Sequence, residues 1–142
     1  MEIFFTPRIA TAIAVYITVV GIVYNTLLRR IWNPQGWDKV ADELLHLVIP
    51  LLFIIYWLLA VPKGELRWRN TFALLVYPLA YFIWVLIFGA LRGWYPYPFI
   101  DVNQLGYSAT LLHSGILTIG FLLLSQLFVA AAALTRKRRR EI

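Results

Sequence analysis

Four long apolar runs dominate the sequence, each about as long as a helix that crosses a bilayer. They occupy residues 7–28, 41–61, 71–91 and 107–134. Because 61% of the 142 residues are hydrophobic, a soluble domain of this size could not bury the apolar surface. The runs therefore predict an all-α integral membrane bundle of four transmembrane helices, forming a single domain over residues 1–142.

Composition excludes several kinds of site. The sequence has no cysteine, which excludes disulfides and thiolate metal sites. No two potential ligands show a metal-binding spacing, so neither a metal nor another cofactor is predicted. The net charge of +6 comes from basic residues at the ends of the apolar runs and in the tail, residues 135–142. These positions indicate membrane topology and membrane lipids as partners, with no nucleic acid, and they leave a homo-oligomer open.

The basic residues also predict an orientation. More of them lie on the side of the two termini and the second loop than on the opposite side. Since short loops rich in Lys and Arg stay in the cytoplasm, both termini are predicted to be cytoplasmic. The tail would then be attracted to anionic lipid of the inner leaflet.

Three ionisable residues, Asp42, Glu43 and His46, open the second apolar run. Glu43, His46 and Pro50 share one face of a helix, and Trp57 continues that face. Pro50 has no N–H to donate, so the carbonyl of His46 needs another polar partner. Because ionisable groups are costly in hydrocarbon and are normally functional there, we predict a site centred on His46.

A stretch rich in aromatic residues and proline, residues 93–103, separates the third and fourth runs. Prolines at alternate positions prevent a regular helix, and the aromatic side chains suit the membrane interface. The stretch is predicted to be an interfacial loop that caps the bundle or a lid over the face of His46, and the two interpretations are compatible. With the predicted topology, polar residues from four segments converge on the outer side. Besides His46, the predicted pocket and orienting residues are Asn25, Asp42, Glu43, Tyr95, Tyr97, Asp101, Asn103 and His113.

Small and hydroxyl-bearing residues form stripes on the first and fourth runs. On the first run, Thr11, Ala14, Thr18, Gly21 and Asn25 recur at spacings of three and four. Such stripes mark the sides where transmembrane helices approach closely, so helix packing is the favoured interpretation from Thr11 to Gly21. Asn25 lies near the same membrane face as His46 and is kept as a site residue.

Three motifs resemble one family, the androgen-induced-protein-like multi-pass membrane proteins and their prokaryotic relatives. They are DELLHLVIP at residues 42–50, YPLAY at residues 77–81 and GWYPYPFID at residues 93–101. The resemblance to the prokaryotic branch implies an all-helical fold in a prokaryotic plasma membrane. In animal members it implies hydrolysis of fatty-acid esters of hydroxy fatty acids by a threonine nucleophile and a histidine, which His46 matches. Members usually have six spans, so the resemblance implies that the first two, with the threonine, are absent from this sequence.

Three functional hypotheses follow. The first is a lipid-ester hydrolase in which His46 is a base oriented by Asp42 or Glu43. The second is a non-enzymatic membrane protein that binds lipid or a partner protein through the same residues. The third is a small transporter or proton pathway, which ranks last because the ionisable groups gather near one end of the spans. For His113 a local hydrogen bond is favoured.

Overall fold

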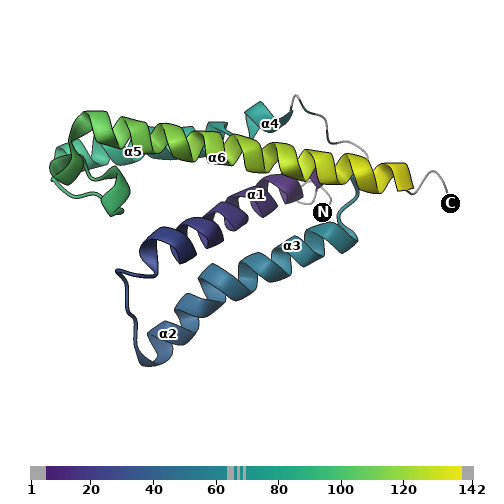
Figure 1. Cartoon of the computed structure of the whole chain (residues 1–142), viewed down its shortest axis with the longest axis horizontal. Helices are drawn as coiled ribbons and strands as arrows, with labels where there is room; N and C mark the ends of the chain where they lie inside the picture. Colours follow the sequence, from purple (N-terminus) through teal and green to yellow (C-terminus); the bar gives the residue numbers. More distant parts are fainter. Residues whose placement is uncertain (1–5, 64–65, 67, 69, 139–142) are drawn as a thin grey trace. The chain divides into compact units, whose positions relative to one another are not determined.

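The computed structural model describes residues 6–63, 66, 68 and 70–138, and in these residues it contains helices and turns but no strand (Figure 1). The all-α prediction is therefore confirmed. In chain order the elements are α1 (Pro7–Val23), η2 (Tyr24–Leu28), α2 (Gly36–Glu43), η3 (Leu44–Val48), α3 (Ile49–Ala60), α4 (Asn70–Ala73), α5 (Val76–Arg92), η4 (Pro98–Ile100) and α6 (Val102–Arg138).

Four helical stretches are long and apolar enough to cross a membrane: Pro7–Leu28, Gly36–Ala60, Thr71–Arg92 and Val102–Thr135. The chain is thus a multi-pass membrane protein. The second helical stretch begins at Gly36, before the predicted residue 41. Gln35 just before it is extended, and the acidic Asp38 in the first turn suits the positive end of the helix dipole.

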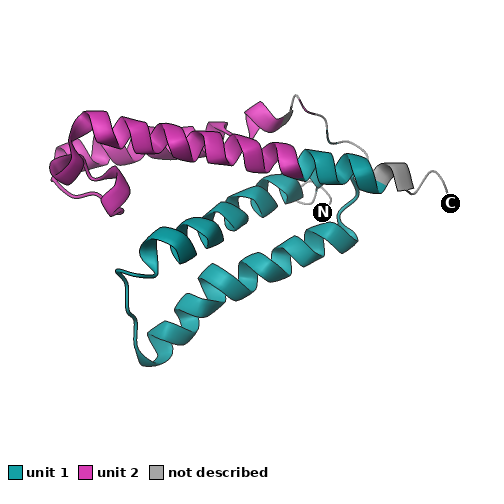
Figure 2. Cartoon of the chain, in the orientation of Figure 1, with its two compact units in different colours: residues 1–66, 128–142 teal, residues 67–127 magenta. Residues whose placement is uncertain are grey.

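The chain divides into two compact units, one of residues 1–66 with 128–142 and one of residues 67–127 (Figure 2). The first unit contains a helical hairpin, in which α1 and η2 run down one arm while α2, η3 and α3 return along the other (Figure 1). We call this segment, residues 7–60, the N-terminal hairpin. Part of the predicted basic tail, residues 139–142, lies outside the described residues.

Small residues of α1 form the packing face of the N-terminal hairpin. Ala14 is fully buried, and the buried Trp57 donates a hydrogen bond of 2.8 Å from its indole Nε1 to Thr11 Oγ1. A Cβ atom added at Gly21 would lie 3.2 Å from the carbonyl oxygen of His46 and 3.3 Å from Pro50 Cβ. The backbones therefore meet most closely where glycine faces proline, as the small-residue stripe predicts.

Both arms of the N-terminal hairpin widen into a π-helical turn, and the two turns contact each other. In η2 the N–H of Arg29 bonds the carbonyl of Tyr24 at 2.8 Å, and in η3 the N–H of Ile49 bonds that of Leu44. Pro50 lies two residues after the end of η3, so the N–H that it lacks falls beside the widened turn. Single π turns are rare in proteins as a whole, but many of those that occur lie at functional sites.

In the second unit α5 follows an interruption at residues 74–75, shortly before Pro78. The missing N–H of Pro78 predicts a kink at this place, and the interruption agrees with it. Gly93 ends α5 in the left-handed conformation (φ 70°), which glycine adopts without a steric penalty.

The aromatic stretch then folds back onto α5. The Tyr95 ring occupies the space that a side chain at Gly89 would need, and it packs with Val85 and Ile100 in a buried cluster. Asp101 accepts hydrogen bonds from the Asn103 N–H at 2.9 Å and from Gln104 Nε2 at 2.8 Å. The stretch is thus fixed by its own packing and hydrogen bonds.

The fourth membrane-spanning stretch begins with a helical turn at Val102, before the predicted residue 107. Gly106 interrupts the helix with φ 73° and ψ 164°, a backbone conformation essentially restricted to glycine. The continuous part of α6 therefore starts at Tyr107, after this break.

Replacing Gly89 with alanine is expected to destabilise the protein, because the new methyl group would overlap the Tyr95 ring. Overpacking of this kind typically costs about 1–3 kcal/mol. The matched control is Gly120→Ala, since a Cβ at Gly120 meets nothing within 4 Å. That change should stabilise α6 slightly, because alanine favours a helix interior. Equilibrium unfolding in mixed micelles measures both, and equal stabilities would contradict the packing of Tyr95 against Gly89.

Candidate functional site

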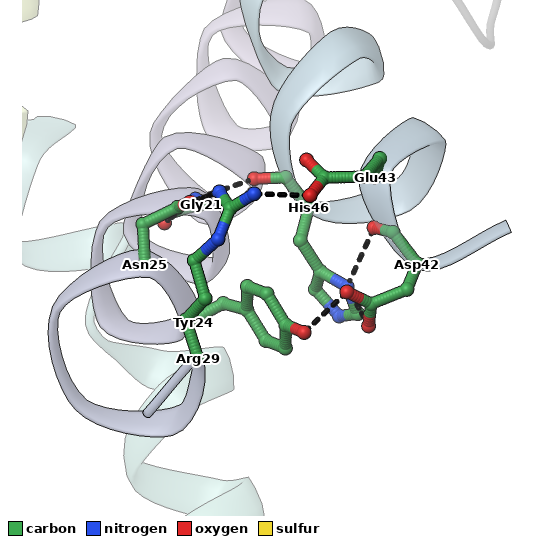
Figure 3. Close-up of polar contacts among 7 residues, drawn as sticks. All are labelled: Gly21, Tyr24, Asn25, Arg29, Asp42, Glu43 and His46. Atoms are coloured by element: carbon green, nitrogen blue, oxygen red, sulfur yellow. Dashed lines mark hydrogen bonds and ion pairs between the residues drawn. The ribbon is translucent and has the colours of Figure 1, made fainter. Parts of the chain in front are cut away.

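Polar side chains gather where the two arms of the N-terminal hairpin approach their connecting loop (Figure 3). Both arms contribute, through the two π turns and the end of α2. We call this group the hairpin cluster: Tyr24, Asn25, Arg29, Asp42, Glu43 and His46.

Asp42 holds the imidazole of His46 from one turn earlier in the chain. His46 Nδ1 lies 3.0 Å from the backbone oxygen of Asp42 and 3.1 Å from its Oδ1 atom. Both neighbours can only accept hydrogen bonds, so Nδ1 is the nitrogen that carries the proton. In the neutral ring Nε2 then has the free lone pair. No residue in the described part of the chain hydrogen-bonds Nε2, and the side chain is 28% exposed, so another molecule can reach it.

Tyr24 fixes the orientation of the same pair. Its ring stacks on the imidazole of His46, with centroids 3.9 Å apart and planes 12° from parallel. Its hydroxyl donates a hydrogen bond to Asp42 Oδ2, and both residues are buried. The carboxylate of Asp42 therefore accepts a hydrogen bond from the phenol and has His46 Nδ1 3.1 Å from its other oxygen, and these contacts compensate for its burial.

Asn25 provides the partner that the carbonyl of His46 requires. Its Nδ2 atom donates to His46 O at 3.0 Å and to the carbonyl of Gly21 at 2.8 Å (Figure 3). The prediction that Pro50 leaves this carbonyl to another polar group is confirmed. The Asn25 side chain thereby ties the two arms together at the π turns.

Arg29 and Glu43 form an ion pair at the edge of the cluster. Arg29 also donates from Nη1 to Asn25 Oδ1 at 2.6 Å. The two side chains are 44% and 31% exposed, so the pair contributes little to stability, about 0–1 kcal/mol. Since Glu43 is engaged with Arg29, Asp42 is the acid that orients His46.

The structure brings together four of the residues predicted for the site, and sequence reasoning missed two others. The four are Asn25, Asp42, Glu43 and His46. The sequence does not indicate Tyr24, because this residue faces the second arm from a π turn that the sequence does not reveal. Arg29 is one of the basic residues at the ends of the apolar runs, and its position four residues after Asn25 allows a contact along a helix.

The remaining predicted residues lie in the second unit and hold the aromatic stretch in place. Tyr97 stacks on Phe99 with centroids 5.4 Å apart, and Asn103 Nδ2 donates to the carbonyl of Gly93 at 2.9 Å. His113 Nδ1 lies 3.0 Å from the carbonyl of Phe99, the local bond favoured for it. Their convergence with His46 remains a prediction.

Tyr95 and Asp101 also have structural partners in the second unit. Burial raises the pKa of the Tyr95 phenol, and nearby Tyr107 and Asp101 add to the shift. The phenol therefore stays protonated at any physiological pH. The Asp101 side chain accepts hydrogen bonds from Asn103 and Gln104 in the turn that precedes Gly106.

The hairpin cluster is suited to proton transfer. Among the described residues, no group of three or more His, Asp or Glu side chains could hold a metal ion. A neutral imidazole whose Nδ1 proton is held by the backbone oxygen of Asp42, with the Asp42 carboxylate beside it, offers Nε2 as a proton acceptor, the arrangement of a general base.

Comparison of the chain with protein-family models, with curated proteins and with solved structures gives no match. The interpretation of the hairpin cluster therefore depends on its own geometry. Its central feature is an oriented, accessible imidazole beside the apolar part of a membrane-spanning helix.

Removing the amide of Asn25 should leave the carbonyl of His46 without a donor. We expect Asn25→Ala to lower the free energy of unfolding by about 1–3 kcal/mol, the cost of a buried unsatisfied acceptor. The control is Thr26→Ala, one position away, whose hydroxyl bonds only the carbonyl of Ile22 in its own helix. This change should stay within about 0.5 kcal/mol.

A double-mutant cycle with Pro50→Ala tests the reason for that cost. The substitution introduces an N–H that can bond the carbonyl of His46, so Asn25→Ala should cost less in the Pro50→Ala background. Unfolding in mixed micelles measures all four proteins. Purely additive effects would show that Asn25 does not compensate for the proline.

Proposed function

We propose that this multi-pass membrane protein hydrolyses lipid esters, with His46 as the general base and Asp42 as the residue that orients it. One observation carries the proposal: Asp42 fixes the proton on Nδ1 and leaves Nε2 accessible. The resemblance of residues 42–50 to lipid-ester hydrolases supports the same reaction class.

In the proposed reaction a water oxygen attacks the ester carbonyl while His46 Nε2 takes a proton from that water molecule. The resulting tetrahedral intermediate collapses, the bond to the alkoxy oxygen breaks, and the imidazolium returns the proton to that oxygen. The products are a carboxylic acid and an alcohol, so atoms and charge balance. Asp42 stabilises the imidazolium while it exists, because its carboxylate faces Nδ1.

Water is the favoured nucleophile for the residues described. The hydroxyl of Thr26 donates to the carbonyl of Ile22, and that of Ser114 donates to the carbonyl of Thr110. Neither is hydrogen-bonded to an imidazole. The threonine that the family resemblance implies has no match in the motifs at residues 42–50, 77–81 and 93–101, so it does not enter the proposal.

The proposed location is the plasma membrane of a prokaryote with both termini in the cytoplasm. This orientation follows from the distribution of Lys and Arg. It would place the loop after η2, and with it the hairpin cluster, at the outer surface. The substrate would then be a lipid of the outer leaflet.

A second candidate is a non-enzymatic protein that binds lipid or a partner protein at the same place. It is favoured by the observation that most polar groups of the hairpin cluster already bond one another, which suits a structural clamp. In that case His46 would anchor a ligand rather than move a proton.

His46→Gln should abolish turnover while the protein still folds, because glutamine keeps a polar side chain but cannot act as a base at neutral pH. Loss of a general base lowers the rate about 10²–10⁴-fold. Asp42→Asn should lower it less, since the imidazole and the backbone oxygen that holds Nδ1 remain but the charge that stabilises the imidazolium is lost. Release of fatty acid from a panel of lipid esters in nanodiscs measures the rates.

The control is Thr118→Ala, which removes a hydroxyl that bonds only within α6 and lies outside the hairpin cluster. It should hydrolyse the same esters at the unmodified rate. If the unmodified protein hydrolyses no ester, or if His46→Gln hydrolyses as fast as Thr118→Ala, the hydrolase proposal is wrong. Ester binding without turnover would favour the second candidate.

A further inference from the structure

The polar contacts of the N-terminal hairpin are ordered along its length. The Arg29–Glu43 pair lies nearest the loop, and the stack of Tyr24 on His46 comes next. Deeper along the arms Gly21 meets Pro50. The charged residues thus lie toward the loop, and the apolar contact lies farther from it.

The loop end of this series has the character of a lipid headgroup zone. The short α2 has the polar sequence GWDKVADE, and the apolar stretch, in which His46 is the one acidic or basic residue, starts after it at Leu44. Trp32 and Trp37 are 60% and 86% exposed, and exposed tryptophan is typical of the membrane interface. The Arg29–Glu43 pair is therefore expected at the depth of phosphates and ammonium groups.

The pair itself can be opened at little cost. Both side chains are partly exposed, and an exposed ion pair contributes little to stability. Arg29 donates to Asn25 and Glu43, which leaves further N–H groups of its guanidinium without a partner among the described residues. A guanidinium with free donors is well suited to a phosphate.

We infer that Arg29 and Glu43 bind the headgroup of a glycerophospholipid that carries a primary ammonium group. Arg29 would take the phosphate and Glu43 the ammonium, so the headgroup dipole replaces the protein's own ion pair. An ordinary anionic lipid fits less well, because it offers nothing to the carboxylate of Glu43.

The carboxylate also favours a primary ammonium over a quaternary one. A quaternary ammonium has no N–H and is usually held by the open faces of aromatic rings. Tyr24 is the one phenyl ring of the hairpin cluster, and the imidazole of His46 covers one of its faces. Glu43 can accept N–H bonds from a primary ammonium, which are strong because both groups are charged.

The order of contacts places an ester bond at His46. The histidine lies three residues beyond Glu43 toward the apolar stretch, about 4.5 Å along a helix axis. In a glycerophospholipid the acyl esters lie just beyond the phosphate in the same direction. The placement of the ester at His46 rests on the proposed function and names its substrate class. Binding of the headgroup by Arg29 and Glu43 does not depend on any hydrolysis.

Lipid competition on the unmodified full chain tests the inference directly. The purified protein is incubated in detergent with equal amounts of dioleoyl phosphatidylethanolamine, its N-acetylated form and dioleoyl phosphatidylglycerol, and native mass spectrometry measures the lipid retained. We expect phosphatidylethanolamine to be retained several-fold above the other two, which keep the phosphate but lack the ammonium. Equal retention of the N-acetylated form would overturn the inference.

Variants then assign the two roles. Arg29→Gln should lower retention of phosphatidylethanolamine about tenfold, as expected for lost bonds to a charged group. Glu43→Gln should remove the preference over phosphatidylglycerol. Arg30→Gln is the matched control, because it removes the same charge at the neighbouring exposed position. An equal loss in Arg30→Gln would show a general charge effect and overturn the assignment.

The outcomes separate this inference from the hydrolase proposal. Selective retention without any turnover leaves headgroup binding in place and removes the enzyme. Turnover of neutral esters with no selectivity for phosphatidylethanolamine would support His46 as the base and would overturn the proposed substrate class.

Discussion

The carbonyl of His46 is the group around which the N-terminal hairpin is built. Pro50 removes its normal helical donor, and an unsatisfied carbonyl in hydrocarbon costs several kcal/mol. Asn25 must therefore stand opposite it, and Gly21 lets the backbone come close enough for the bond. Once this register is fixed, Tyr24 meets Asp42 and Arg29 meets Glu43 without further choice. The missing N–H of Pro50 thus accounts for the bond between Asn25 and the carbonyl of His46, and the other polar pairs lie beside that bond.

The buried part of this network is costly as a means of stabilisation alone. Asp42 is buried, and a buried carboxylate must be hydrogen-bonded merely to offset the loss of water. An apolar pair such as Gly21 against Pro50 holds the arms together without that cost. A chain that needed only a helix contact could do without the ionisable groups. Their presence is better explained by what they offer together, an imidazole with one fixed nitrogen and one accessible nitrogen.

The sequence alone predicts the class, the four spans and the face shared by Glu43, His46 and Pro50, because these follow from hydrophobic length and helical spacing. It cannot decide whether Asp42 or Glu43 orients the imidazole. Adjacent residues differ by about 100° around a helix, and a π turn between them and His46 changes the angle further. Tyr24 is missed for the same reason. The sequence locates the aromatic stretch correctly. It does not predict that the Tyr95 ring packs on Gly89, because this contact joins residues on either side of a chain reversal.

The position of His46 along its arm is the feature of the hairpin cluster that suits the proposed hydrolysis of lipid esters. Ester hydrolysis in a membrane needs water and an acyl chain at one place, although the two separate everywhere else. The polar α2 lies on one side of the histidine and the apolar α3 on the other, so the imidazole stands at the boundary between both environments. A histidine buried at the centre of the span would meet no water, and one in the loop would meet no ester. Paired π turns and a proline at this boundary keep the backbone from closing into a regular helix, which leaves the side chains of both arms directed at one another.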